Sequence, residues 1–374
     1  MHKYSWKNID IINLLFLGLT PIFAVILTCI WINNGDFHWG QIIMGIIFYI
    51  FTGMSITGGY HRLFAHKAYD AHWNVKLFYL LFGAASFENS VLKWGSDHRR
   101  HHNKVDTEED PYNINEGFFY AHMGWVFLKK NSQIHEKYAQ DFLKDKLVMW
   151  QHNNYMLIAV GMGIILPTLL GGLFFDSYLG GFAVGGLGRI VLTHHCTFFI
   201  NSLCHKMGSM PYTDTNSAKD HWFMALLTFG EGYHNFHHYF QNDYRNGIRW
   251  YHFDPTKWLI KTLSLSGLAS KLRLTSQDKI LAAKMQMKLK RMKLKTEAAD
   301  NFSIELEKLK SQAIDTLKKL QAMKDEYKAM KAHASRELLA EFKHKMKTTQ
   351  EEFRRTLDQW EALANYYRLV VVQA

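Results

Sequence analysis

Four long apolar runs constrain this chain more than any other feature of its sequence. They cover residues 11–32, 39–60, 155–175 and 178–200, and the first three contain no Asp, Glu, Lys or Arg. About 20 apolar residues in a helix are enough to cross the hydrocarbon core of a bilayer. Pro21 lies inside the first run, and membrane helices tolerate proline. We therefore predict an all-α integral membrane protein with four transmembrane helices.

The short connections between these runs predict their orientation. Residues 33–38 and 176–177 contain no Lys or Arg, whereas cytoplasmic loops gather basic residues. Both connections should therefore face away from the cytoplasm, which places both termini on the cytoplasmic side. A further apolar stretch, residues 77–87, is too short to cross. We expect it to lie as a helix at the cytoplasmic interface. Nine glycines from Gly161 to Gly188 favour close packing of the third and fourth helices.

One histidine pattern, HxxHH, occurs twice in the chain. Its six members are His98, His101, His102, His234, His237 and His238. Positions i, i+3 and i+4 of a helix share one face, so the three imidazoles of each pattern can converge. Taken alone, one such triplet fits a solvated basic helix as well as it fits a metal site. Its repetition favours the metal site.

Three further histidines complete a set of nine. His61 and His66 follow the second run, and His205 follows Asn201 by four residues at the end of the fourth. Nitrogen ligands exclude magnesium and calcium, which take oxygen, and leave zinc, copper or iron. A structural zinc site closes with four ligands, so nine histidines indicate two metal ions with open positions. All the clusters lie on the side predicted to be cytoplasmic.

Carboxylates near these histidines could accept a hydrogen bond from the second ring nitrogen of a ligand, as could asparagine or backbone oxygens. The candidates are Asp97, Asp106, Glu109, Asp110 and Glu231. Such bonds would fix which ring nitrogen is free to bind a metal.

Four segments, HRLFAH, DHRRHH, NSLCH and GEGYHNFHH, resemble the histidine boxes of the membrane-bound fatty acyl desaturases of the stearoyl-CoA Δ9 type, in a bacterial form without a fused cytochrome b5. The resemblance extends over roughly residues 10–265. It implies four transmembrane helices under a cytoplasmic cap, and two iron ions held by the nine histidines, with Asn201 contacting one iron through a water molecule. It also implies an enzyme that uses O2 to introduce a cis double bond, at Δ9, into saturated C16–C18 acyl chains.

The same resemblance implies a bent apolar tunnel for the acyl chain. Trp94 and Thr197 match positions at its bend, and Tyr49 and Gly53 match positions near its closed end. Asp97 and Arg189 match other positions that bind the substrate. Arg189 lies inside the fourth run, where an ionisable residue is itself a functional signal. Ser96 stands where acyl-CoA members often carry a basic residue. The substrate can therefore be carried by CoA, by a phospholipid or by a carrier protein.

The sequence holds no HPGG haem signature, no GxGxxG motif and only three cysteines, none in a CxxC pair. Electrons should therefore come from a separate donor of the ferredoxin, rubredoxin or cytochrome b5 type. Two other functions stay open. One is a fatty acyl or alkane hydroxylase on the same di-iron centre, and the other is a membrane scaffold without catalytic activity. We expect membrane lipids, but no nucleic acid, among the partners.

Residues 271–374 differ in composition from the membrane domain predicted over residues 1–270. They carry 23 Lys and Arg against 14 Asp and Glu, and no glycine or proline occurs after Gly267. Apolar residues recur every three or four positions from Leu306 to Met346, which predicts one long amphipathic helix with coiled-coil character. The basic beginning of this tail, residues 271–295, is either a solvated face or a contact for anionic lipid or an acidic donor. The apolar stripe would serve self-association or packing on the cap.

Overall fold

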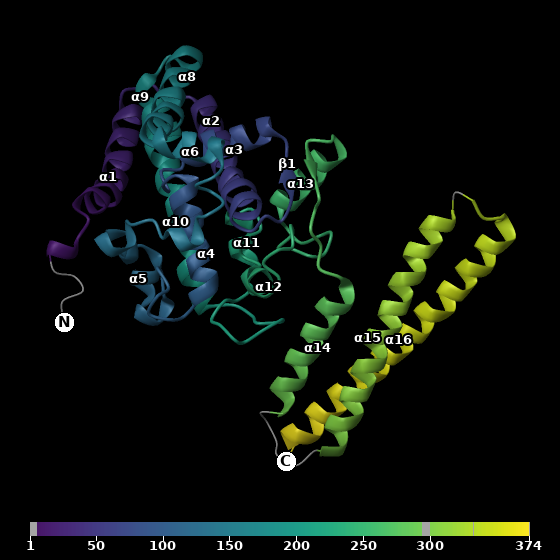
Figure 1. Cartoon of the computed structure of the whole chain (residues 1–374). Coiled ribbons are helices and arrows are strands. Elements are labelled where there is room, and N and C mark those ends of the chain that lie inside the picture. Colours follow the sequence, from purple (N-terminus) through teal and green to yellow (C-terminus); the bar gives the residue numbers. More distant parts are fainter. Residues whose placement is uncertain (1–5, 294–299, 332, 374) are drawn as a thin grey trace. The chain divides into compact units, whose positions relative to one another are not determined.

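A computed structural model describes residues 6–293, 300–331 and 333–373 of the chain, and it is mostly helical (Figure 1). The chain forms two compact units. The first comprises the residues up to 210 together with residues 215–274, and the second comprises residues 211–214 and those from 275 onwards. This division falls after residue 274, so residues 271–274 belong to the first unit. The expected domain boundary after residue 270 stays a prediction.

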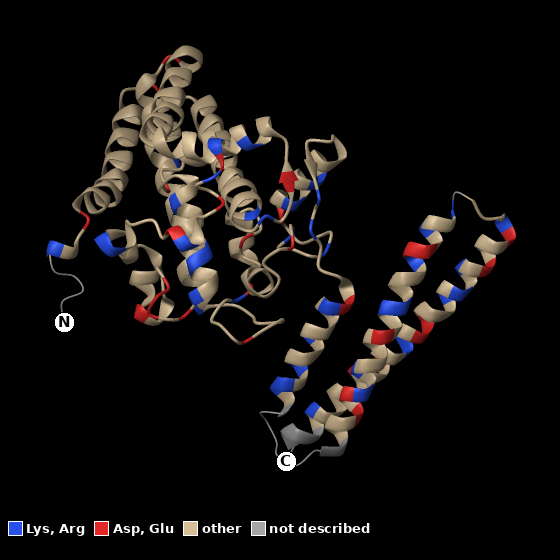
Figure 2. Cartoon of the chain, in the orientation of Figure 1, with Lys and Arg blue, Asp and Glu red and all other residues tan. Residues whose placement is uncertain are grey.

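Among the described residues of the first unit, three helices are long and apolar enough to cross a membrane. They are α1 (Ile11–Asn33), the continuous helix formed by α2 (Trp39–Met54) and η2 (Ser55–Ala65), and the helix formed by α7 (Tyr155–Val160), η7 (Gly161–Ile165) and α8 (Leu166–Phe175). Large apolar side chains point outward from them, with Ile12, Leu157 and Phe174 each more than 70% exposed. In Figure 2, α1, α2 and α8 show almost no charge along their length. Such an apolar surface suits the hydrocarbon core of a bilayer.

A fourth continuous helix follows, composed of α9 (Tyr178–Gly180), η8 (Gly181–Gly188) and α10 (Arg189–Lys206). It packs closely on the third, as the glycines predict: a Cβ atom on Gly171 would lie 2.5 Å from the Cα of Gly181. That this helix is a fourth transmembrane span stays a prediction, because it is not among the three helices above.

The second helix runs five residues beyond the predicted end of its span. It ends at Ala65, so His61 lies inside its last turns, which are wound as a π-helix, and does not follow the span. The helix expected over residues 77–87 is α3 (Trp73–Ala84). The side chains of Tyr60, Tyr79 and Leu80 are fully buried where η2 packs against α3.

The remaining elements of the first unit are shorter. Among them, α4 (Val91–Lys104) packs against η2 and α3, and its N-terminus is capped by the side chain of Ser90. Strands β1 (Asp70–Ala71) and β2 (Ala269–Ser270) pair antiparallel, with Asp70 opposite Ser270. The others are η1 (Trp6–Asn8), η3 (Ile114–Glu116), α5 (Phe118–His122), η4 (Gly124–Phe127), η5 (Lys129–Asn131), η6 (Glu136–Tyr138), α6 (Lys146–Asn153), α11 (Trp222–Leu227), α12 (His234–Tyr239) and α13 (Pro255–Leu265).

The second unit corrects the prediction that one helix runs from Leu306 to Met346, because two helices share that stretch. Its helices are α14 (Gln277–Lys293), α15 (Asp300–Met330) and α16 (Arg336–Gln373). The last two lie side by side as an antiparallel hairpin (Figure 1), with the indole N–H of Trp360 donating to the carbonyl of Leu306 at 3.0 Å. Ser335 begins α16 by accepting a hydrogen bond from the backbone N–H of Leu338. An N-cap interrupts a helix without changing the apolar spacing on either side, so periodicity alone did not reveal this break.

Candidate metal centre

All nine predicted histidines come together in the first unit, from four places in the fold. The last turns of η2 and the residue after them carry His61 and His66, α4 carries three, the end of α10 carries His205, and α12 carries three. They form two groups, and the candidate ligand atoms of each group lie within 4.8 Å of one another. The groups are His61, His66, His98, His102 and His237, and His101, His205, His234 and His238.

The Nε2 atoms of these histidines face one another instead of facing protein acceptors. In the first group, Nε2 of His61 lies 2.9 Å from that of His237, and Nε2 of His66 lies 2.8 Å from that of His98. In the second, Nε2 of His234 lies 3.0 Å from that of His205 and 3.0 Å from that of His238. A neutral imidazole has a single N–H, so these atoms cannot all satisfy one another. A cation at the centre of each group would, and the all-nitrogen donor set therefore fits a first-row transition metal.

Three of the histidines have an oxygen atom close to the opposite ring nitrogen, Nδ1. Nδ1 of His61 lies 2.9 Å from Glu231, and Nδ1 of His101 lies 2.9 Å from Asp110. Nδ1 of His205 lies 2.7 Å from the hydroxyl of Ser217. Such contacts place the proton on Nδ1 and direct the lone pair of Nε2 toward the ligand position.

The five candidate carboxylates therefore divide. Glu231 and Asp110 contact histidines directly, and Asp106 contacts Ser217, one step further from His205. Asp97 pairs instead with Lys93, four residues earlier on α4, and Glu109 pairs with Lys104 at the surface.

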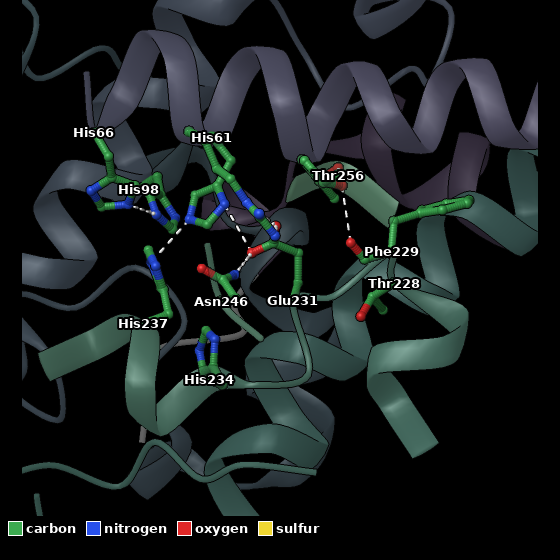
Figure 3. A network of polar contacts seen from close by, with 12 residues as sticks. His61, His66, His98, Thr228, Phe229, Glu231, His234, His237, Asn246 and Thr256 are labelled. Carbon is green, nitrogen blue, oxygen red and sulfur yellow. Dashed lines mark hydrogen bonds and ion pairs between the residues drawn. The ribbon is translucent and has the colours of Figure 1, made fainter. Parts of the chain in front are cut away.

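A buried ionic network holds Glu231 beside His61 (Figure 3). Arg62 donates to Glu231 through Nε and Nη2, and the side-chain amide of Asn246 donates to the other carboxylate oxygen at 2.7 Å. Burial alone would raise the pKa of Glu231, but His61 and Arg62 outweigh it and lower that pKa to about 2. The acceptor beside His61 is therefore ionised at neutral pH. Burial and the surrounding histidines lower the pKa of His98 well below its usual range, which keeps that ring neutral and able to bind a metal.

A cavity of about 310 Å³ lies against the metal groups. Four of the histidines line it, namely His61, His98, His101 and His234, and so do the predicted residues Tyr49, Gly53, Trp94, Asp97, Thr197 and Asn201. The ring of Trp94 stacks on that of His98, with centroids 4.9 Å apart and planes 20° from parallel. The cavity and the metal groups thus share a wall.

Glu88 is a residue of this cavity that the sequence reasoning missed. One of its carboxylate oxygens accepts a hydrogen bond from the indole N–H of Trp94 at 3.2 Å, and the other accepts one from the hydroxyl of Thr197 at 2.9 Å. Glu88 therefore joins the two residues expected at the bend of the tunnel, and burial raises its pKa to about 7. The available signal was a lone acidic residue between Asp70 and Asp97.

Phe229 lines the cavity beside the two residues expected at its closed end. Its ring centroid lies 5.3 Å from that of Tyr49, and a Cβ atom added to Gly53 would lie 2.2 Å from its ring edge. The hydroxyl of Tyr49 donates to the carbonyl of Leu227. Space at this end is therefore set by a few side chains in contact.

Arg189 is the one expected substrate residue that the structure does not bring to the cavity. It is buried, and its guanidinium donates to the carbonyls of Gly185, Ala85 and Gly163 at 3.2, 2.6 and 2.7 Å. Arg189 thus joins the fourth helix to the third and to the residues after α3. All its contacts are to backbone oxygens, and this explains the arginine without a ligand.

Comparison with known proteins agrees with this geometry. The family model described as fatty acid desaturase matches residues 37–269. The chain is 41% identical over 305 residues to the probable acyl-CoA desaturase of Schizosaccharomyces pombe, covering 81% of this chain and 63% of that protein. It is 43% identical over 259 residues to acyl-CoA desaturase 1 of Saccharomyces cerevisiae, covering 69% of this chain and 51% of that protein.

This chain therefore spans less than two thirds of the length of the two yeast relatives. The stearoyl-CoA desaturase of Homo sapiens is 32% identical over 285 residues, and the match covers 75% of this chain and 77% of that protein. The family model takes in all four histidine clusters, most of the lining of the cavity beside them and most of the first unit. This chain is a member of the fatty acid desaturase family.

Proposed function

We propose that this protein is a di-iron, O2-dependent fatty acyl desaturase that introduces a cis double bond, at Δ9, into saturated C16–C18 chains. One observation carries the proposal. Two groups of converging histidines, four of which line a mostly apolar cavity, lie beside the residues matched to the bend and closed end of the tunnel. The names of the relatives, acyl-CoA and stearoyl-CoA desaturase, support the same reaction.

The nine histidines are the proposed iron ligands, with Asn201 on the cavity wall contacting one ion through water. Two iron ions held there would supply the reduction of O2 and the removal of two hydrogen atoms from neighbouring methylene groups. The reaction balances as –CH2–CH2– plus O2, two electrons and two protons, giving –CH=CH– and two waters. An external donor supplies the two electrons.

The residues of the chain position the substrate and exclude water. Glu88 holds Trp94 and Thr197 in place by two hydrogen bonds, so the wall of the cavity at the bend is fixed beside His98. An acyl chain that follows this wall brings its middle methylene groups next to the histidines. A bend held before the substrate arrives selects the geometry in which those methylenes react.

We propose acyl-CoA as the carried substrate, in agreement with the names of the relatives. Ser96 is not expected to hold the phosphates of CoA, because it is fully buried and its hydroxyl donates to the carbonyl of His135 at 3.0 Å. Other groups would therefore hold the carrier, and an acyl lipid stays the alternative.

The proposal includes four spans, with the metal groups on the cytoplasmic side. The continuous helix from Tyr178 to Lys206 supports the fourth span, and the connections 33–38 and 176–177, free of Lys and Arg, support the orientation. Self-association through the hairpin of α15 and α16 stays a prediction.

The deciding experiment is fatty-acid analysis of cells that express the chain, with the double-bond position determined. We expect Δ9 monounsaturated C16 and C18 acids, which appear only with the intact chain and O2. Hydroxylated acids would identify the hydroxylase. Unchanged fatty acids in cells that contain the folded, iron-loaded protein and a supplied electron donor would favour the scaffold.

We expect the substitution Gly53→Ala to shorten the preferred substrate. The new methyl group would lie 2.2 Å from the ring of Phe229 and would drive that ring into the end of the cavity. The ratio of C16 to C18 products should rise several-fold. Gly161→Ala is the matched control, because a Cβ atom there meets nothing within 4 Å. An active Gly53→Ala enzyme with an unchanged product ratio would show that Gly53 does not set chain length.

A further inference from the structure

A second pocket, of about 390 Å³, reaches the metal groups from a different direction. His66 and His102 line it, and both belong to the group of five histidines. It shares no lining residue with the cavity of about 310 Å³ described above, which we call the acyl cavity. That cavity is lined instead by His61, His98, His101 and His234. The histidines of the centre thus face two separate spaces, one for the substrate and one with no role so far.

The second pocket is polar and basic. Lys67, Arg99 and Arg273 line it together with amide side chains, and no described lining residue is acidic. Asp141 pairs with both Lys67 and Arg99, and Asp70, which pairs with Lys271, lies near enough to Arg273 to feel its charge. An acyl chain would gain nothing there, because its methylene groups would displace water from charged groups.

Arg99 and Arg273 differ in whether their side chains are available to bind another molecule. Arg99 is committed to the fold, since it also donates to the carbonyls of Phe64, Ala65 and Tyr138. Arg273 is exposed on a fixed backbone, whose N–H donates to Ala68 and whose carbonyl accepts from Tyr244. Arg273 therefore presents a positive charge at a defined position beside the metal ligands.

We propose that an acidic one-electron carrier protein docks over this pocket and passes electrons through His66 and His102. The proposal rests on the proposed function, because desaturation consumes two electrons per double bond. Two reduced carriers, each losing one electron, supply them in turn. Only an imidazole ring separates the pocket from the ligand positions, and electron transfer slows steeply with distance. The basic rim would attract an acidic carrier and orient it.

The test compares binding of a carrier to three variants of the full chain in detergent micelles. The probes are a soluble, acidic haem domain of the cytochrome b5 type and a plant-type ferredoxin. Arg273→Glu should weaken the binding of at least one probe tenfold or more at low ionic strength, and the difference should shrink as salt is added. Arg273→Lys keeps the charge and should bind nearly as the original chain does. Lys261→Glu makes the same change of charge at an exposed position of α13 that lines neither pocket, and should bind normally.

Iron content, and reduction of the centre by dithionite, are measured on the same samples. Both should be unchanged in Arg273→Glu, which separates docking from metal assembly. If that variant loses iron, Lys67→Asn replaces it and should weaken binding likewise, because it also removes a positive charge from the pocket. Asparagine is chosen because it tolerates the positive φ of 50° at Lys67.

Equal binding of both probes by Arg273→Glu and Lys261→Glu would overturn the proposal. So would a variant that loses affinity for inorganic phosphate or for anionic vesicles but not for either carrier, because the pocket would then be an anion or headgroup site. A chain that makes double bonds in cells but shows no effect of Arg273 refutes the docking site alone. A chain that holds no iron and makes no product, even with donors supplied, refutes the proposed function.

Discussion

Replacing His237 by alanine should reduce product formation at least 100-fold and lower the iron content from about two per chain. His237 lies between His61 and His102, with its Nε2 atom 2.9 and 3.0 Å from the Nε2 atoms of those two residues. Its loss therefore removes the nitrogen at the centre of the group of five histidines. Removing a residue that merely orients a ligand already costs about 10–100-fold in metal affinity or activity. Removing a ligand should cost more. Iron analysis and fatty-acid profiles of the purified variant check both effects.

The control for this prediction is His344→Ala, which removes an exposed histidine of α16 outside the metal groups. It should keep full iron content and activity. His101→Ala tests the other group and should also lose iron, because it removes a member of the group of four. A His237→Ala enzyme with normal iron and normal product would remove His237 from the proposed ligands.

The second large effect is expected from Arg62→Met. Arg62 is 1% exposed and bridges two buried carboxylates, donating to Glu231 and to Asp254 and also to the carbonyl of Tyr244. Methionine fills a similar space but leaves both carboxylates without their cation. Breaking a buried pair in this way costs about 3–5 kcal/mol. We expect a large drop in the midpoint of thermal unfolding and a partial loss of iron, because Glu231 also orients His61.

The pH dependence of this effect follows from Glu231. Its pKa is lowered from 4.5 to about 2 by its partners in the folded protein, so the stabilisation is fully present above pH 4.5 and is lost as the pH falls toward 2. The contribution of Glu231 to the stability of the original chain should therefore stay constant from pH 6 to pH 8. Arg249→Met, at an exposed arginine, is the control and should unfold as the original does. Equal unfolding midpoints for the two variants would show that the bridge does not stabilise the fold.

Local pattern in the sequence was enough for the long helices and for the histidines. The apolar runs 11–32 and 155–175 became helices with almost the same ends, because uninterrupted apolar composition depends on no distant contact. The spacing HxxHH placed three histidines on one face of α4 and three on α12, because helical periodicity fixes which side chains share a face. The family resemblance then indicated that these faces should meet.

The sequence could not give the features that depend on pairs of residues far apart in the chain. Glu88 meets Thr197 across 109 positions, and Asp106 meets Ser217 across 111, and no periodicity encodes either contact. The same holds for Arg189, whose position suggested a ligand but whose partners are carbonyls of other helices. The break before α16 was missed because a single N-cap interrupts a helix without altering its apolar stripe.

The amino-acid sequence by itself therefore determined which residues could bind metal and which segments could enter a membrane, since both follow from composition and short-range spacing. Only the tertiary structure decided how the nine histidines divide into groups of five and four, and which carboxylates orient them. It also decided that His66 and His102 face a basic pocket while His98 and His101 face the acyl cavity. The physical reason is that an imidazole has two distinct nitrogens and two faces, and only the packing of neighbouring elements selects what each of them meets.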